Sequence, residues 1–472
     1  MNGGNRFLCA ASALALSGFA ALALTGCGHG SMSSTSTSTA GATSSAMIVT
    51  VGDAPLSNIL SAQVTISAAS LTPSGGGSSI TVLSQSHTIE LSSLGAIQQP
   101  LETDDVAAGT YSAVNVTVSS ATVTYLDSNG KVVTGTATVN SPNDTVTFNP
   151  ALTVTQGQDV HLSLNFNLAQ SFDLSGTTLT FTPSITTAAA SIEQESEANR
   201  EVEVTGSVVS ISSTSITVQS ACTGVQSTFA INSSTMFSAN TSASSIKQGS
   251  IVSVHGAVQT DGSLLATMIS ASMHGDAMNM SQGGGRGIVT AVTMSNGAVT
   301  SFTFVPREDF GDNSSNTPMN VMLSASTTYG VSEDAVQQGI AATAFTNAEI
   351  FRGQSVQVIG TVSNGAIAAQ EIDLAPESLS GTLTATPQGA APAFTFTLQL
   401  PTQSFLTTYD SLTMLDVATN AQTQFEGSLT SSTFASLAAG TNLELHGYLL
   451  MDSSNNYTLT VANINQTEGS DH

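Results

Sequence analysis

A cluster of methionine and histidine side chains is the first group in this sequence whose types could do chemistry. The cluster consists of Met273, His274, Met278 and Met280, which lie in a glycine-rich stretch. Soft thioether sulfurs and an imidazole nitrogen could together hold Cu(I). The alternative, which we favour, is a linker that happens to contain methionines.

A second cluster carries oxygen ligands of the kind that bind Ca2+. It is the acidic stretch of Glu308, Asp309, Asp312 and Asn313, inserted in the second of three repeated segments. The spacing is not that of an EF-hand loop, so we favour a solvated surface loop. We therefore predict that the protein holds no metal and no other cofactor.

Three further carboxylates could bind a ligand or catalyse hydrolysis. Asp53 precedes a turn at Pro55 and could bind a ligand. We favour a local role, because an Asp at the start of a turn caps backbone N–H groups. Asp104 and Asp105 form a carboxylate pair of the kind that glycoside hydrolases use. Adjacent strand residues point to opposite faces, so we interpret this pair as part of a turn before Gly109.

Histidine and cysteine offer little more. His255 and His446 occupy the same position in two repeats where the other repeat has Ile359, so we interpret them as structural. Cys222 has no histidine or basic residue nearby in sequence to lower its pKa, and we expect an inert, buried thiol. The G-x-S-x-G, H-E-x-x-H, P-loop and C-x-x-C motifs are all missing from the sequence. We predict a protein that is not an enzyme, and we assign no catalytic residue.

The N-terminal segment carries the clearest chemical signal. An apolar run from Phe7 ends in Leu24, Thr25, Gly26 and Cys27, which resemble a bacterial lipobox. Residues 1–26 would then be a signal peptide, and Cys27 would be the lipidation site. Its sulfur would bear a diacylglycerol, and its amino group would bear an acyl chain such as palmitate. A transmembrane anchor would need about 20 strongly apolar residues, which this alanine-rich run with two serines does not supply.

A lipid at Cys27 implies a location. We expect the protein to be anchored in the bacterial cell envelope, facing the periplasm or the cell surface. Gly28 follows the cysteine, where the enteric pattern for inner-membrane retention has an aspartate, so we expect the outer membrane. Residues 27–46 are dominated by Ser and Thr and predict a flexible tether.

Composition restricts the partners. The chain of 472 residues has 7 Lys and Arg against 32 Asp and Glu, a formal net charge of -25 and no Trp. Such a chain is repelled by nucleic acid, so we predict no nucleic-acid partner. We expect the membrane, through the anchor at Cys27, and an envelope polysaccharide or protein as the possible partners.

The elements that must position these residues are strands. From residue 47 to 187 apolar residues alternate, most clearly at Leu162, Leu164 and Phe166, with His161 and Ser163 on the other face. This pattern predicts half-buried antiparallel strands in a β-sandwich. Asp127-Ser128-Asn129-Gly130 predicts a hairpin turn within this domain.

Four short segments of this domain carry a family resemblance. They are Gly52-Asp53-Ala54-Pro55, Ala108-Gly109-Thr110-Tyr111, Phe166-Asn167-Leu168-Ala169-Gln170-Ser171 and Thr182-Pro183. Together they resemble the bacterial lipoprotein domain called domain of unknown function 4382. Asn167 stands where that family often has an aspartate. The resemblance implies an envelope location and no established catalytic activity.

Three repeats follow a linker at residues 188–201. Each has a Gly-to-Gly spacing of seven residues with apolar residues at alternate positions between, at Gly249–Gly256, Gly353–Gly360 and Gly440–Gly447. This spacing predicts a strand entered through one glycine turn and bent at another. The segments resemble domain-of-unknown-function family 5666, most clearly in the first repeat, and the third is divergent.

The predicted architecture is therefore all-β, an N-terminal β-sandwich followed by three small OB-like β-barrel repeats. We place the repeats at residues 202–273, 286–375 and 379–466, with a Met/Gly-rich connector at 274–285. An OB-like outline does not confer nucleic-acid binding. The function that we expect is a non-enzymatic envelope lipoprotein acting as a binding or structural module. The alternatives are a carbohydrate-binding or adhesin-like protein, suggested by the Ser/Thr/Asn-rich sandwich faces, and a hydrolase.

Overall fold

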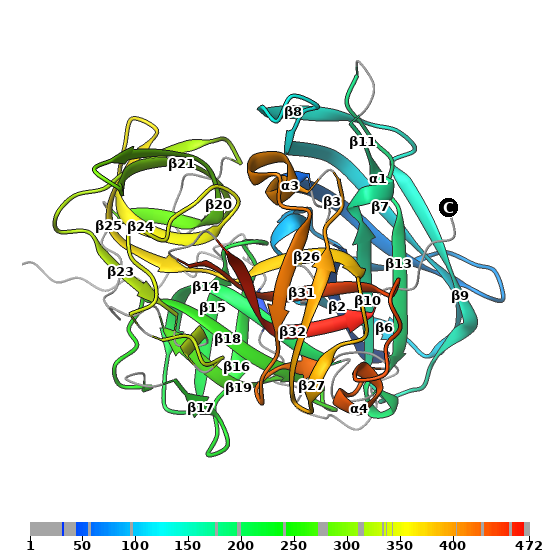
Figure 1. Ribbon diagram of the computed structural model, residues 1–472. Helices are drawn as coiled ribbons and strands as arrows, with labels where there is room; N and C mark the ends of the chain where they lie inside the picture. Colours follow the sequence, from blue (N-terminus) through cyan, green and yellow to red (C-terminus); the bar gives the residue numbers. More distant parts are fainter. Residues whose placement is uncertain are drawn as a thin grey trace, which may run out of the picture. The chain divides into compact units, whose positions relative to one another are not determined.

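Alternating apolar residues and frequent glycines fold the described part of this chain mainly into β-strands, as the sequence predicts (Figure 1). The computed structural model describes residues 31–32, 44–54, 58–94, 98–174, 178–195, 200–238, 242–271, 282–309, 316–332, 335–336, 338–341, 343–402, 404–425, 429–452 and 456–466. Residues 31–472 form one compact unit. Among the described residues, no helix is both long and apolar enough to cross a membrane.

The first domain, called the sandwich below, contains two sheets. The smaller sheet has the strand order β13-β10-β2-β6. Its strands are β2 (Ser44–Ala54), β6 (Gln99–Ala107), β10 (Val160–Asn167) and β13 (Ile185–Ser191). β10 pairs with β2 in parallel and with β13 in antiparallel fashion.

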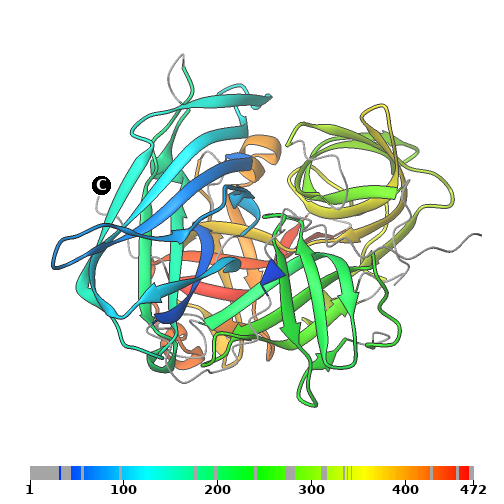
Figure 2. The same cartoon turned by 180° about the vertical axis from the view of Figure 1, so that it is seen from behind.

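The larger sheet has the order β11-β12-β8-β7-β3-β4, with β5 paired to β3 and β9 paired to β7. Its strands are β3 (Ile59–Pro73), β4 (Ile80–Leu83), β5 (His87–Glu90), β7 (Gly109–Leu126), β8 (Val132–Val139), β9 (Asn143–Val154), β11 (Phe172–Asp173) and β12 (Thr180–Phe181). The long strands β3 and β7 are among those drawn in blue and cyan in Figure 2. Short helical turns are η1 (Leu91–Ser93), α1 (Leu168–Ser171) and η2 (Ile192–Gln194).

One apolar core joins the two sheets. Val49 and Leu164 of the smaller sheet share this core with Val64 and Val116 of the larger one. The hairpin turn predicted at residues 127–130 lies between β7 and β8, where Asp127 Oδ1 accepts hydrogen bonds from the N–H groups of Asn129 and Lys131 at 2.8 and 2.9 Å. The predicted β-sandwich is therefore confirmed.

Strand β10 differs from the sequence prediction in one respect. Leu162, Leu164 and Phe166 enter the core as expected, but His161 and Ser163 on the opposite face are buried as well. The reason is a cover that alternation alone does not reveal. Glu195, just after η2, hydrogen bonds His161 from outside the sheet.

Three barrels of one topology follow the sandwich. In each, five strands close a ring in the order first-second-third-fifth-fourth-first. The third and fifth strands pair in parallel, and one further short strand runs parallel to the fifth. Figure 1 shows the strands β20, β21, β24 and β25 curving around one of these rings. The predicted barrel-like repeats are thus confirmed, with an OB-like strand order.

The five ring strands of each barrel are bounded as follows. In repeat 1 they are β14 (Glu201–Ile211), β15 (Ser215–Ser220), β16 (Gln226–Ala230), β18 (Ile251–Val258) and β19 (Leu264–Ala271). In repeat 2 they are β20 (Gln282–Ser295), β21 (Ala298–Asp309), β22 (Met319–Met322), β24 (Ser355–Ser363) and β25 (Ala366–Leu374). In repeat 3 they are β26 (Glu377–Leu383), β28 (Ala393–Gln399), β29 (Met414–Ala418), β31 (Asn442–Met451) and β32 (Tyr457–Gln466).

Short elements complete the barrels. The extra parallel strands are β17 (Met236–Phe237), β23 (Thr328–Val331) and β30 (Gln424–Phe425), and repeat 3 adds β27 (Gln388–Ala390). Repeat 3 also has two short helices, α3 (Phe405–Asp410) and α4 (Ser431–Phe434). Strand β1 (Ser31–Met32) pairs in parallel with β16 of repeat 1.

The repeated glycines have a steric cause. Gly256, Gly360 and Gly447 each follow a register shift in the fourth strand of their barrel. A Cβ atom at these positions would lie 2.6, 2.3 and 2.4 Å from a carbonyl oxygen of the fifth strand. The strand can therefore bend there only if the residue has no side chain.

Each repeat also has a buried threonine before its short parallel strand. The Oγ1 atoms of Thr235, Thr327 and Thr423 donate to carbonyl oxygens of the fifth strand at 2.8, 2.9 and 2.8 Å. These threonines link the start of the short parallel strand to the fifth strand, and they occupy the first position of the aligned segments at 235–237, 327–329 and 423–425.

Several strands extend past the domain limits that we expected. β2 begins at Ser44 and β1 lies at 31–32, both inside the expected tether at 27–46. β13 continues to Ser191, inside the expected linker at 188–201. β20 begins at Gln282, inside the expected connector, where Gly284 is needed because its Cβ would lie 1.9 Å from the Val358 carbonyl oxygen.

Candidate functional site

The two metal-binding clusters of the sequence fall largely outside the described residues. Met273, His274, Met278 and Met280 all lie outside them, as do Asp312 and Asn313 and the side chain of Asp309. Within the part of the chain that the structure describes, no group of three or more His, Cys, Asp or Glu side chains could hold a metal ion.

Glu308 corrects our expectation of a solvated acidic loop. It belongs to strand β21, and its side chain is only 1% exposed. Both of its carboxylate oxygens accept hydrogen bonds from the guanidinium of Arg286. The carboxylate of Glu308 is therefore engaged by a cation on the neighbouring strand β20.

The aspartates of the sandwich lie apart from that pair. Asp53 is in β2, where its backbone pairs with Phe166, and its side chain lies outside the described residues. Asp104 and Asp105 are in strand β6 and not in a turn, which corrects our interpretation. Asp104 Oδ1 accepts a hydrogen bond from the Asp105 N–H at 2.8 Å, so this carboxylate is engaged locally.

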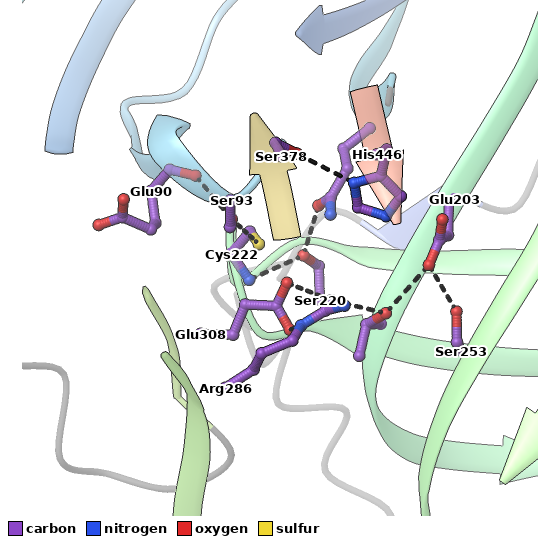
Figure 3. Close-up of polar contacts among 12 residues, drawn as sticks. Glu90, Ser93, Glu203, Ser220, Cys222, Ser253, Arg286, Glu308, Ser378 and His446 are labelled. Carbon is purple, nitrogen blue, oxygen red and sulfur yellow. Dashed lines mark hydrogen bonds and ion pairs between the residues drawn. The ribbon is translucent and has the colours of Figure 1, made fainter. Parts of the chain in front are cut away.

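The arginine at the start of repeat 2 lies in a cluster of polar side chains (Figure 3). Arg286 Nε donates to Glu308 Oε2 at 2.9 Å, and Nη2 donates to Thr205 Oγ1 of repeat 1 at 3.3 Å. Burial disfavours the charge on Arg286, but Glu308 outweighs it and raises the pKa of the guanidinium. The guanidinium therefore stays charged, and its contact with Thr205 joins repeats 1 and 2.

Glu203 and two histidines form the second part of this cluster. Glu203 accepts a hydrogen bond from Ser253 at 2.7 Å and lies 3.6 Å from His255 Nδ1. Burial alone would raise the pKa of Glu203, but His255 and Arg286 hold it below its ordinary value. His446 of repeat 3 hydrogen bonds Ser378 at 2.9 Å, and burial lowers its pKa to about 4.

Cys222 lies where repeat 1 meets the sandwich, and its side chain joins the sandwich core. Its Sγ lies 2.9 Å from Ser93 Oγ, and its carbonyl oxygen accepts a hydrogen bond from the Glu90 N–H at 3.1 Å. Burial raises the pKa of this thiol well above its ordinary value. A thiol held neutral in this way is a poor nucleophile, in agreement with the inert cysteine that the sequence predicts.

Two more arginines of repeat 2 connect it to its neighbours. Arg307 pairs with the fully buried Glu377 of repeat 3 at 3.0 Å, and its Nε donates to the Leu60 carbonyl oxygen of the sandwich at 2.7 Å. Arg352 pairs with Asp410 of repeat 3 at 3.2 Å and lies 5.1 Å from the centre of the Tyr409 ring. Sequence reasoning did not identify any of these contacts.

A hydroxyl, an imidazole and a carboxylate lie in series on the smaller sandwich sheet, an order known from hydrolase triads. Thr50 Oγ1 lies 2.8 Å from His161 Nε2, and His161 Nδ1 lies 3.0 Å from Glu195 Oε2. Thr50 also donates to Gln98 Oε1 at 2.9 Å. Thr50 is 0% exposed and His161 2% exposed, so a substrate has no access to the hydroxyl. The geometry therefore fits a structural connection that holds Glu195 over β10.

Comparison with known proteins places two families on this framework. Residues 44–183 match the model described as Domain of unknown function (DUF4382). Residues 205–270 match the model described as Domain of unknown function (DUF5666). The two matches follow one another along the chain. The DUF4382 match falls on the sandwich, the DUF5666 match falls on repeat 1, and repeats 2 and 3 share the strand order of repeat 1.

Solved structures add no further argument. Two crystal structures of the single-stranded DNA binding protein from Thermus aquaticus, a deletion mutant and the wild type, are 15% identical to this chain over 40% of its length and 95% of theirs. Their TM-scores are 0.18 and 0.17, too low to support any statement about fold or function. No curated protein matches the chain.

Proposed function

We propose that this protein is a lipid-anchored, non-enzymatic component of the bacterial cell envelope, in which the DUF4382 domain and the three barrels act together as one rigid binding or structural module. Cys27 is the anchoring residue, and the outer membrane is the proposed location. The proposal rests on the lipobox-like N-terminus together with the way in which the described polar groups are used.

The observation that carries the proposal is the use of the arginines. Arg286, Arg307 and Arg352 each bond to a domain other than repeat 2, in which they all lie. The chain has 7 Lys and Arg in total, and three of them thus make contacts between domains. Cations engaged in this way stabilise one arrangement of domains and do not serve a substrate.

The same use of charge argues against nucleic acid as a partner. Binding to phosphates needs a groove lined by several accessible cations. The net charge of -25 opposes the approach of a polyanion, and the three arginines above are engaged in ion pairs. We therefore propose that the barrels, although OB-like in strand order, do not bind single strands.

Acylation of Cys27 is the test of this proposal. The full chain is expressed in a Gram-negative host with an alkyne analogue of palmitate, and a Cys27→Ser variant serves as the matched control. We expect the label in the wild type alone and in the outer-membrane fraction, with a mature N-terminal peptide whose mass includes the acyl groups. An unlabelled wild-type chain found in the soluble fraction would overturn the proposal.

A further inference from the structure

The outward face of the larger sandwich sheet carries two ordered rows of uncharged polar side chains. The first row crosses β5, β3 and β7, where Thr88, Thr65 and Ser120 face one another by register. Thr65 Oγ1 lies 2.9 Å from Thr88 Oγ1 and accepts a hydrogen bond from Ser120 Oγ at 2.8 Å. Val64 and Ile66, the neighbours of Thr65 in the chain, point into the core.

The second row crosses β3, β7 and β9. Asn115 Nδ2 donates to Thr72 Oγ1 at 2.8 Å, and Thr145 Oγ1 donates to Asn115 Oδ1 at 2.7 Å. Between the rows, Thr117 Oγ1 donates to Asn143 Oδ1 at 2.8 Å. These side chains hold one another in fixed rotamers, so a ligand would find their remaining hydrogen-bonding capacity already oriented. We call the two rows, with the pair between them, the hydroxyl face.

The side chains of the hydroxyl face are exposed or half-buried. None of them is charged and none is a large apolar or aromatic group, so the face lacks the anchors around which protein interfaces form. The chain as a whole carries a net charge of -25, which repels anionic polymers. An uncharged partner rich in hydroxyl groups suits both properties.

From this arrangement we infer that the hydroxyl face is a docking surface for an uncharged polysaccharide. Groups on neighbouring strands are about 4.8 Å apart and alternate groups along a strand about 6.7 Å apart, so the face is a lattice of donors and acceptors on the scale of sugar hydroxyls. Without aromatic stacking each sugar contributes little, and binding requires many sugars at once. The inference deepens the proposed function, because it names the ligand class of the binding module.

Affinity electrophoresis of the full chain in non-ionic detergent tests the inference. Native gels contain dextran, hydroxyethyl cellulose or galactomannan as neutral polymers, and alginate as the anionic comparison. We expect retardation by at least one neutral polymer and none by alginate. Isomaltotriose, cellotriose or mannotriose, matched to the retarding polymer, should compete at least about 100-fold more weakly per sugar than that polymer does.

The decisive variant is Thr65→Val/Thr117→Val/Thr145→Val, which keeps the shape of the face and removes three hydroxyls. Its matched control is Thr217→Val/Thr228→Val, which removes a half-buried cross-strand threonine pair with a 2.9 Å Oγ1 contact from repeat 1. We expect at least tenfold weaker retention for the face variant alone, with both variants keeping the wild-type melting temperature.

Two outcomes would overturn the inference. One is the absence of retardation by every neutral polymer, and the other is an equal loss of retention in the repeat 1 control. Neither outcome touches the acylation of Cys27, so failure of the docking surface is distinguishable from failure of the proposed anchor and location.

Discussion

Two buried carboxyl groups lie close together on β25, and one of them, Asp373, makes the stability of the fold depend on pH. Asp373 and Glu371 lie two residues apart on the strand, and both are buried. Burial, followed by the nearby Glu371, raises the pKa of Asp373 well above its ordinary value. Asp373 is therefore protonated in the folded chain at a pH at which the unfolded chain ionises it.

This shift has a definite sign for stability. The unfolded carboxyl loses its proton near pH 4, and the folded one holds it to higher pH, so the free energy of unfolding falls as the pH rises above about 4. We expect Asp373→Asn to stabilise the chain by about 1–3 kcal/mol at pH 7 and by nothing near pH 3. Chemical denaturation at both pH values measures the difference.

The control for this substitution is Asp416→Asn. Asp416 lies exposed on β29, where it accepts a hydrogen bond from Thr397 at 3.2 Å, and its substitution should change stability by less than about 0.5 kcal/mol. If Asp373→Asn destabilises the chain at pH 7, the carboxyl is ionised in the folded state and our account of the pair is wrong.

His446 has the opposite dependence on pH. Burial lowers its pKa to about 4, with Glu203 opposing the shift and Arg286 and His255 adding to it. The unfolded histidine takes up a proton below about pH 6.5 and the folded one only near pH 4. The contribution of the neutral imidazole to stability is therefore complete above about pH 6.5 and is lost as the pH falls toward 4.

Substitution of His446 should flatten that part of the pH profile. A pKa difference of this size corresponds to at most about 3 kcal/mol, and His446→Gln removes it while keeping a polar group beside Ser378. We expect wild type and variant to differ less in stability at pH 4.5 than at pH 7, as measured by urea denaturation. Parallel profiles between pH 7 and 4.5 would show that His446 does not carry the dependence.

At the scale of the elements, the bent fourth strand is the feature that the three barrels share. Each bend needs a glycine because the fifth strand passes directly over it. In repeat 3 the fourth strand is β31, and Tyr448, which follows Gly447, enters the core of repeat 2. The bend therefore lies in the ring of repeat 3 and also places the Tyr448 side chain in the core of repeat 2.

A methyl group at this bend should lower the free energy of unfolding. In Gly447→Ala the new Cβ would lie 2.4 Å from the Thr460 carbonyl oxygen, which is backbone and cannot move aside. We expect a loss of about 1–3 kcal/mol in the free energy of unfolding, measured by urea denaturation. Gly75→Ala is the control, because no atom lies within 4 Å of its new Cβ, and this change should leave stability within about 0.5 kcal/mol.

These glycines were visible in the sequence because strand bends repeat at a fixed spacing. The alternation of β10 was visible for the same reason, since a strand buries every second residue. The cover over His161 was not predictable, because Glu195 reaches it from a segment with no periodic pattern. Glu308 was misread as a loop residue, because its partner Arg286 lies 22 residues earlier on a neighbouring strand.

At the scale of the whole molecule, Arg307 links domains that are far apart in sequence. Its contact with the Leu60 carbonyl oxygen spans 247 residues, and its contact with Glu377 spans 70. No local pattern encodes such contacts. The sequence did contain one usable signal, which is the scarcity of cations in so acidic a chain. Each arginine among the described residues makes a specific structural contact.

The ion pair between Arg307 and Glu377 provides the test of rigidity at this scale. Burial raises the pKa of Glu377, while Arg307 opposes that rise. Arg307→Met leaves a buried carboxylate without its partner, and we expect a loss of about 3–5 kcal/mol. In Arg307→Met/Glu377→Gln the uncompensated charge is gone, so most of this loss should be recovered. Calorimetry of the wild type and of both variants measures these losses in stability, and the three proteins together form a mutant cycle.

The same cycle distinguishes a rigid module from independent domains. If the arginines hold the domains together, Arg307→Met should separate the unfolding of repeat 3 from that of the sandwich, and limited proteolysis should cut between them while wild type resists. Arg200→Met is a suitable control, because Arg200, just before β14, donates to the Val258 carbonyl oxygen of the adjoining repeat 1 at 3.3 Å. Equal proteolysis of wild type and Arg307→Met, with a loss below about 1 kcal/mol, would mean that the domains behave as separate units and that the module is not rigid.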